Sequence, residues 1–166
     1  MPKKQRQPRL NSMRLLDANR VHYEPVVFSP DIHSATEVAE VVGIDPAMVY
    51  KTLVVLRAAG RPLLVMIAGN RELDLKALAA SIGEKRVHMA THREAESLTG
   101  LQVGGISALA LLNKGFDIFI DRPAQDLEWV TVSAGQRGIN LRLAVADLVR
   151  VTGARWVDAT AEPDKP

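Results

Sequence analysis

The stretch VYKTLVVL at residues 49–56 has the composition of a β-strand, because β-branched and apolar residues fill it. Side chains alternate between the two faces of a strand, and both faces here are mainly apolar, which predicts a central, covered strand. Lys51 places a single charge on one of these faces. A buried charge without a partner is costly, so its ammonium must meet a carboxylate, carbonyl groups, water in a cleft or a ligand. The alternative is a lysine at the strand mouth whose stem packs while its head reaches water.

Two further stretches carry small residues in a pattern typical of ligand-holding turns. GLQVGGIS at residues 100–107 contains three glycines, and paired glycines allow positive φ angles and close backbone approach. The exposed amides of residues 104–107 could cradle an anion or a carbonyl oxygen, although paired glycines more often form plain turns. VSAGQRG at residues 132–138 repeats the theme, and Ser133 is there either a binding hydroxyl or a turn hydroxyl.

Several motifs together resemble the YbaK family of aminoacyl-tRNA editing deacylases, kin of the editing domain inserted in some bacterial prolyl-tRNA synthetases. The motifs are VYKTL at 49–53, LDLKALA at 73–79, VGGIS at 103–107, IDRPAQ at 120–125 and VSAGQRG at 132–138. The likeness runs from about Leu15 to Val157, which is nearly the whole chain. It implies an α+β fold with a mixed, curved, partly barrel-like β-sheet flanked by helices.

The resemblance also implies the residues of a site. Lys51 matches the family's functional lysine, Gly105 the glycine of its loop and Ser133 the serine of its third motif. Lys51 and Gly105 are therefore the predicted catalytic residues. The predicted substrate-binding residues are Phe28, which falls at an aromatic pocket position, together with Gly104, Ile106, Ser107 and Ser133.

The chain departs from the family's cysteine-clearing members at three positions. Ala108 follows Ser107 where those members have proline, and Asn140 stands where they have aspartate. Ser34 falls near a position that is aromatic in those members. A smaller, more polar pocket wall would admit a different amino acid, so the departures bear on the amino acid more than on deacylation.

The function implied by the resemblance is trans-editing: hydrolysis of mischarged aminoacyl-tRNA, with Cys-tRNA(Pro) or a related small amino acid on tRNA(Pro) as substrate. The expected partners are the acceptor end of that tRNA and prolyl-tRNA synthetase, and neither a cofactor nor a metal is expected. The nucleophile would be water or the substrate's own thiol. A non-catalytic module that binds tRNA or a synthetase, and a small-molecule esterase, are the alternatives.

Length and composition limit the other possibilities. A chain of 166 residues suits one domain, placed at residues 13–160 after a disordered basic extension at 1–12. That extension holds four of the 21 basic residues and no acid, so the remainder carries 17 basic against 19 acidic residues. The body is thus no basic nucleic-acid binder by bulk charge. Without a membrane span or signal peptide, the expected location is the cytoplasm, and the oligomeric state stays open.

Cysteine is absent, which excludes disulfides, thiolate metal sites and a cysteine nucleophile. The four histidines, at positions 22, 33, 88 and 92, have no convincing metal-ligand spacing. The remaining patterns predict helices near residues 11–18, 34–43, 74–82, 93–98 and 143–151, and strands near 21–28, 49–57, 62–68, 87–89, 116–120, 129–132 and 154–157.

Overall fold

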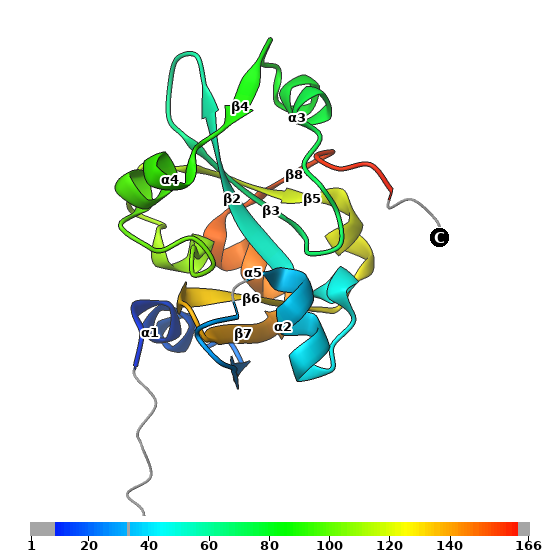
Figure 1. Ribbon diagram of the computed structural model, residues 1–166. Coiled ribbons are helices and arrows are strands. Elements are labelled where there is room, and N and C mark those ends of the chain that lie inside the picture. The colour runs from blue at the N-terminus through cyan, green and yellow to red at the C-terminus, as the bar shows by residue number, and fades with distance from the viewer. Residues whose placement is uncertain (1–8, 33, 163–166) are drawn as a thin grey trace, which may run out of the picture.

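Figure 1 shows a computed structural model of the protein, in which residues 9–32 and 34–162 are described. Two β-sheets and several helices make up this part of the chain. The helices are α1 (Asn11–Ala18), α2 (Ala35–Val42), α3 (Leu75–Ile82), α4 (His92–Thr99) and α5 (Val145–Thr152), with short 3-10 helices η1 (Pro46–Met48), η2 (Ala108–Ala110) and η3 (Arg122–Asp126). The strands are β1 (Tyr23–Val27), β2 (Tyr50–Arg57), β3 (Leu63–Ala68), β4 (Val87–Met89), β5 (Asp117–Asp121), β6 (Trp129–Gln136), β7 (Ile139–Ala144) and β8 (Arg155–Val157).

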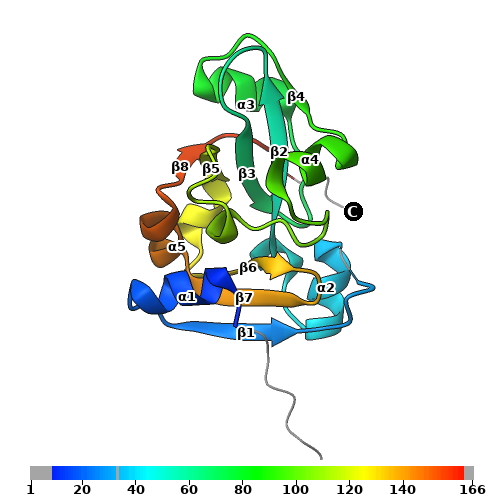
Figure 2. The ribbon, with the colours of Figure 1, turned by 90° about the vertical axis from the view of Figure 1, so that its left-hand side faces the viewer.

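The larger sheet has the strand order β4-β2-β3-β5-β8 and mixes antiparallel and parallel pairs. β2 is antiparallel to both β3 and β4, whereas β5 runs parallel to β3 and to β8. The smaller sheet is antiparallel with the order β1-β7-β6. Figures 1 and 2 both place it below the larger sheet, and the bridge between Val49 and Thr131 joins the start of β2 to β6.

The helices begin and end where their sequences supply caps. The Ser34 hydroxyl accepts a hydrogen bond from the Glu37 amide at the start of α2, and the Asp74 carboxylate caps α3 in the same way. α3 ends at Gly83, whose left-handed backbone (φ 75°) is a conformation that glycine adopts without strain. Pro25 lies in β1, which is an edge strand where a missing N–H is tolerated.

The core lies on both faces of the larger sheet, and β3 is buried along its whole length. Alternation along β2 sends Val55 to the face that packs with Leu78 of α3. Val54 points to the opposite face, which packs with the apolar side of the smaller sheet. The predicted central, covered strand is therefore confirmed.

The α+β class is confirmed, but the expected single sheet is two sheets, which do not form a closed barrel. The sequence interpretation missed β7, where the apolar residues Ile139, Leu141 and Leu143 alternate with exposed or cavity-facing ones. The last helix begins at Val145, because Leu143 and the residue after it pair with β6. The missed strand and the shifted start of the last helix have one cause: the residues of β7 were interpreted as a turn followed by the start of a helix.

Part of the predicted basic extension, residues 1–8, lies outside the described residues, and so does His33. The helix α1 already begins at Asn11, so the boundary placed after residue 12 falls inside it. Ser12 is fully buried there and donates a hydrogen bond to the Ala134 carbonyl of β6. No helix in residues 9–32 and 34–162 combines the length and apolar character needed to cross a membrane.

Candidate functional site

A cavity of about 210 Å³ lies where the start of β2 meets α2 and the smaller sheet. Segments that lie far apart in the sequence contribute to its wall, so the fold rather than any one motif assembles it. The lining residues are Phe28, Ser34, Ala35, Thr36, Val38, Val49, Tyr50, Lys51, Thr52, Leu53, Gly69, Gly104, Ile106, Ser133 and Asn140. Five of the seven predicted site residues are among them: Phe28, Lys51, Gly104, Ile106 and Ser133.

Lys51 is the second residue of β2 and is half-buried. Burial lowers the pKa of its ammonium, and the negative charge of Glu72 opposes this shift to a smaller extent. Within the described part of the chain, no carboxylate comes within ion-pair distance of Lys51. A cation that lines a cavity without an ion-pair partner is able to bind an oxygen atom of a ligand.

The shifted pKa predicts how stability depends on pH. The pKa of Lys51 in the folded protein lies below the usual lysine value. The free energy of unfolding therefore rises as the pH rises from the folded-state pKa of Lys51 to its unfolded-state pKa. Replacing Lys51 with methionine is expected to raise the thermal midpoint near neutral pH, and this advantage should shrink near pH 10, close to the unfolded lysine pKa of about 10.4. Midpoints measured at both pH values check this, with Lys85→Met at an exposed position as the control. An advantage that grows with pH would contradict it.

The loop at residues 100–107 is held from two sides. The Val103 amide donates to a carboxylate oxygen of Glu96 in α4 at 2.9 Å, and Arg137 donates from Nε to the Val103 carbonyl at 2.7 Å. Gly104 has a positive φ of 92°, so a side chain there would be strained. These contacts fix the loop against the turn between β6 and β7.

Gly105 has a different part in the loop from the one predicted. Its amide donates to the Gln102 carbonyl at 2.8 Å, so it is already used and does not point freely into the cavity. A Cβ at this position would come within 2.9 Å of the Arg137 amide nitrogen and 3.0 Å of the Gln136 carbonyl carbon. Gly105 therefore allows close packing of the loop, whereas its neighbours Gly104 and Ile106 line the cavity.

Ser133 and Asn140 face each other across the β6–β7 pair and both line the cavity. The Ser133 hydroxyl accepts a hydrogen bond from the Gly135 amide at 3.1 Å, which supports its turn function and leaves its own proton available to a ligand. Asn140 is buried, with 7% of its surface exposed. The alternation Ile-Asn-Leu-Arg-Leu from residue 139 is the sequence signal that would have paired it with Ser133.

The remaining predicted residues lie around the same site. Phe28 contributes its ring to the small apolar cluster under α2 and lines the cavity. Ser34, which departs from the family pattern, caps α2 and lines the cavity as well. Ser107 is not in the lining: it is 1% exposed, and its buried hydroxyl has no hydrogen-bond partner among the described residues. Its predicted contact with substrate thus has no support in the cavity geometry.

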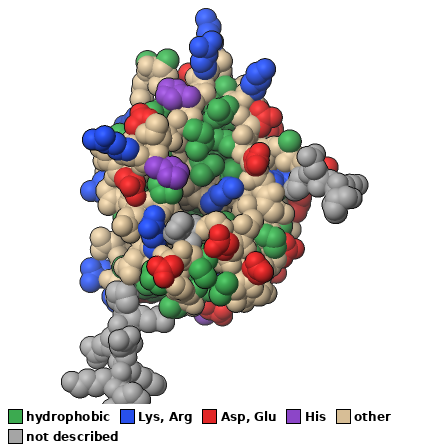
Figure 3. Space-filling view, viewed as in Figure 1, with side chains coloured by type: hydrophobic (Ala, Val, Ile, Leu, Met, Phe, Trp, Pro, Cys, Tyr) green, Lys and Arg blue, Asp and Glu red, His purple; other side chains and the backbone are tan. Residues whose placement is uncertain are grey.

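Figure 3 shows how charge is distributed over one face of the molecule. Acidic side chains gather in its lower part, over α2, while basic and acidic side chains are interspersed above, over β4 and α4. Two histidines belong to those elements, His88 in β4 and His92 in α4, and both are exposed. Among residues 9–32 and 34–162, no group of three His, Asp or Glu side chains is arranged to hold a metal ion.

The cavity belongs to a fold shared with solved structures. A structure titled hypothetical protein APE2540 superposes with a TM-score of 0.83 at 25% identity, covering 91% of this chain and 99% of that one. Another, provisionally described as a trans-editing enzyme for prolyl tRNA synthetase, has a TM-score of 0.76 at 23% identity, covering 93% and 99%. At 23% identity, the likeness to this second structure shows a shared fold and no more.

Sequence comparison covers the cavity residues too. An Enterococcus faecalis protein provisionally named Cys-tRNA(Pro)/Cys-tRNA(Cys) deacylase EbsC is 35% identical over 164 residues, which is 98% of this chain and 99% of that one. A proline–tRNA ligase of Thermodesulfovibrio yellowstonii is 35% identical over 78 residues, covering 47% of this chain and 13% of the ligase. The family described as Aminoacyl-tRNA editing domain matches residues 29–151. The predicted family is confirmed: the chain belongs to the aminoacyl-tRNA editing domain family.

Proposed function

We propose that this protein is a trans-editing deacylase that hydrolyses the ester between a small, wrongly attached amino acid and the terminal ribose of tRNA(Pro), with cysteine as the leading candidate. The observation that carries the proposal is the cavity that Lys51, the loop residues Gly104 and Ile106, and Ser133 line together. The E. faecalis relative with a Cys-tRNA deacylase name supports the choice of substrate.

The chemistry needs little from the protein, because an aminoacyl ester is already activated. A nucleophile adds to the ester carbonyl, the carbonyl oxygen becomes an oxyanion, and the ribose oxygen leaves with a proton. We assign the backbone amides of Gly104 and Ile106, two residues of the cavity lining, as the donors to that oxyanion. The Lys51 ammonium binds the ribose or a phosphate of the terminal nucleotide, or the oxyanion itself. Water is the nucleophile, or the thiol of the substrate when the amino acid is cysteine.

The size and polarity of the cavity fit a small acyl group. Its volume of about 210 Å³ is below the several hundred Å³ typical of sites for larger ligands. Ser34, Ser133 and Asn140 add polar groups to a wall that Phe28 and Val38 make apolar at other points. Such a wall suits cysteine, alanine, serine or threonine better than a bulky side chain.

The tRNA is the proposed partner, and prolyl-tRNA synthetase is a further one. Proline–tRNA ligases share sequence with this chain over a part of their length, which suggests that the two proteins act on the same tRNA. We expect the polyanionic acceptor stem to lie toward β4 and α4, because acidic side chains gather over α2 (Figure 3).

A deacylation panel tests the function directly. The protein is added to tRNA(Pro) charged with cysteine, alanine, serine, threonine or proline, and release of each amino acid is followed. We expect rapid release of at least one small non-cognate amino acid and slow release of proline. Binding of all five without turnover would favour the non-catalytic module, and cleavage of free amino-acid esters but not of aminoacyl-tRNA would favour a small-molecule esterase.

We also expect deacylation to survive removal of divalent metal from the protein. We expect this because the Lys51 ammonium and the amides of Gly104 and Ile106, all residues of the cavity lining, are able to stabilise the oxyanion without a Lewis acid. The protein is dialysed against a chelator and assayed with excess chelator, using a tRNA refolded beforehand so that RNA structure is not the variable. Loss of activity that returns on addition of zinc would contradict this expectation.

A further inference from the structure

The cavity borders an edge of β2 and not only one of its faces. Four consecutive residues of this strand line it: Tyr50, Lys51, Thr52 and Leu53. Side chains alternate between the two faces of a strand, so no single face presents four consecutive residues. The cavity therefore extends along the edge of β2, where the amide and carbonyl groups of the main chain lie.

The pairing of β2 shows which main-chain groups point to that edge. In an antiparallel ladder, successive residues direct their N–H and C=O groups to opposite sides of the strand. The Val49 carbonyl accepts from the Gly69 amide at 2.7 Å, on the side of β3. The Val54 carbonyl accepts from the Ala90 amide at 3.1 Å, on the side of β4. Thr52, two residues before Val54, therefore directs both of its main-chain groups away from β3.

This edge of β2 is open at Thr52. Within residues 9–32 and 34–162, β4 pairs with β2 from Val55 onward, and β6 reaches this part of the chain in a single bridge between Val49 and Thr131. Thr52 lies between these two contacts and is 9% exposed, so its amide is sheltered from bulk water. A buried main-chain amide needs a hydrogen-bond partner, and a ligand in the cavity is able to supply one.

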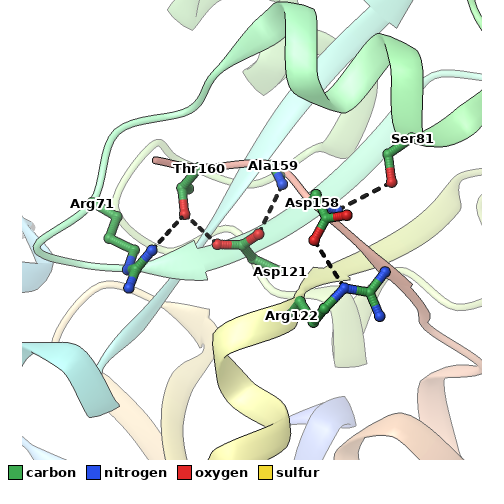
Figure 4. Close-up of polar contacts among 7 residues, drawn as sticks. All are labelled: Arg71, Ser81, Asp121, Arg122, Asp158, Ala159 and Thr160. Carbon is green, nitrogen blue, oxygen red and sulfur yellow. Dashed lines mark hydrogen bonds and ion pairs between the residues drawn. The ribbon is translucent and has the colours of Figure 1, made fainter. Parts of the chain in front are cut away.

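The other edge of the larger sheet, at β8, is closed by the chain itself, as Figure 4 shows. There the Ala159 amide donates to the buried Asp121 carboxylate at 2.8 Å, and the Asp158 amide donates to the Ser81 hydroxyl at 3.1 Å. The described part of the chain places no such segment along β2 at Thr52, where the cavity lies instead. The two edges therefore differ in what satisfies their main-chain groups.

We propose that the aminoacyl group of the substrate docks on the open edge of β2 like one further strand residue, with the Thr52 amide donating to its ester carbonyl. The inference deepens the proposed function and rests on it for the identity of the substrate. An aminoacyl ester carries an ammonium donor and a carbonyl acceptor on either side of one Cα, as a strand residue carries its N–H and C=O. Recognition of an extended backbone by an open strand edge is a common binding mode.

The direction of docking decides which carbonyl receives the ammonium. In an antiparallel arrangement the ammonium donates to the Thr52 carbonyl, and in a parallel one it donates to the Tyr50 carbonyl, which points to the same edge. The Thr52 amide donates to the ester carbonyl in both arrangements. It thus joins the amides assigned at Gly104 and Ile106 as a donor to the developing oxyanion.

Docking of this kind selects α-amino esters independently of the side chain. Every amino acid presents the same ammonium and carbonyl, so the strand edge positions the ester bond. The choice among small side chains then falls to the rest of the cavity wall. An acyl group without an ammonium loses its bond to the carbonyl of β2.

An amide-to-ester replacement tests the Thr52 donor. The α-hydroxy analogue of valine is placed at position 52 by nonsense suppression, so that an oxygen atom replaces the N–H. The reference protein is Thr52→Val, which keeps the amide. We expect kcat/KM for deacylation to fall by about 100-fold relative to this reference, the lower end of the range for loss of an oxyanion donor. The thermal midpoint should fall only slightly, because this N–H does not face β3.

The same hydroxy acid at position 55 is the matched control. Val55 is paired with Leu63 of β3, its N–H faces that strand, and it does not line the cavity. The replacement there should lower the thermal midpoint more than the replacement at position 52 does. It should leave kcat/KM, assayed well below the midpoint, at the value of the parent. Full activity with the ester at position 52, or equal losses of kcat/KM at both positions, would overturn the inference.

A binding measurement without turnover separates this inference from the proposed function. The probe is 3′-(alanylamino)-3′-deoxyadenosine, whose amide linkage resists hydrolysis, and its lactyl counterpart carries a hydroxyl in place of the ammonium. In protein labelled with ¹⁵N-threonine, the Thr52 amide signal is assigned by its loss in Thr52→Val. We expect the alanyl probe to shift this signal, and the lactyl probe to bind at least about 10-fold more weakly.

The outcomes of this measurement are distinct from those of the deacylation panel. An unshifted Thr52 signal, equal affinities for the two probes, or no binding of the alanyl probe would each overturn the inference. A protein that binds the alanyl probe through Thr52 but deacylates no aminoacyl-tRNA defeats the proposed function alone.

Discussion

Replacing Lys51 with alanine is expected to lower deacylation by about 10- to 1000-fold, which corresponds to about 1.4–4 kcal/mol of transition-state stabilisation. The folding stability should hold or rise slightly. Both expectations follow from one observation: the half-buried ammonium lines the cavity, and no carboxylate of the described chain pairs with it. Removing it therefore takes away a ligand-binding cation and a desolvation cost together.

Two other functions of Lys51 predict different results. A lysine paired with a buried carboxylate would leave that carboxylate unpaired when removed, at a cost of about 3–5 kcal/mol of stability. A lysine whose stem packs while its head only reaches water would change neither activity nor stability much. Activity on mischarged tRNA and the thermal midpoint, measured on one preparation, separate the three cases.

Lys85→Ala is the matched control for this experiment. Lys85 is exposed, lies between α3 and β4, and does not line the cavity, so its loss tests the effect of removing one positive charge from the surface. We expect it to change kcat/KM for tRNA only slightly and more at low salt. An active Lys51→Ala variant with an unchanged midpoint would end the case for Lys51 as a functional residue.

The central part of the fold could be predicted because its signals are local. β-Branched residues in VYKTLVVL predict β2, and Asp74 and Gly83 mark the two ends of α3. The smaller sheet could not be predicted in this way. Its pairing joins β1 to β7, which are more than 100 residues apart in the chain, and only tertiary contacts select that partner.

Most of the residues that line the cavity together could be named from the sequence, but their individual contacts could not. The resemblance to an editing family named Lys51, Gly105 and Ser133, which come from three distant segments. The cavity brings together Lys51, Ser133 and Gly104, the neighbour of Gly105. The resemblance could not reveal that the Gly105 amide is bonded to Gln102, since backbone hydrogen bonds in a loop depend on φ and ψ angles that the sequence leaves open.

Replacing Gly105 with alanine is the second large effect that we expect: a loss of deacylation of about 100- to 1000-fold, the range for removing an oxyanion donor. The cause is steric. The new Cβ would stand 2.9 Å from the Arg137 amide nitrogen and 3.0 Å from the Gln136 carbonyl carbon. Both contacts are with backbone atoms, which cannot rotate away as a flexible side chain can. Either the loop or the β6–β7 turn must therefore move.

Movement of the loop would displace Gly104 and Ile106, which line the cavity, and would strain the bond from Arg137 to the Val103 carbonyl. We expect a loss of folding stability of about 1–3 kcal/mol, as for other overpacked sites. The activity loss should exceed what this destabilisation alone produces, because the folded fraction stays high while the donors are misplaced. Assays well below the thermal midpoint of the variant make that comparison.

Gly100→Ala supplies the control, because Gly100 begins the same loop and has a left-handed backbone (φ 71°) with nothing within 4 Å of a new Cβ. It should lose about 1 kcal/mol of stability from backbone strain and keep its activity, since no contact with the β6–β7 turn is disturbed. A crystal structure of Gly105→Ala should show the loop or the turn displaced. Full activity in that variant would contradict the assignment, because it would mean that the position of this loop backbone does not matter for the reaction.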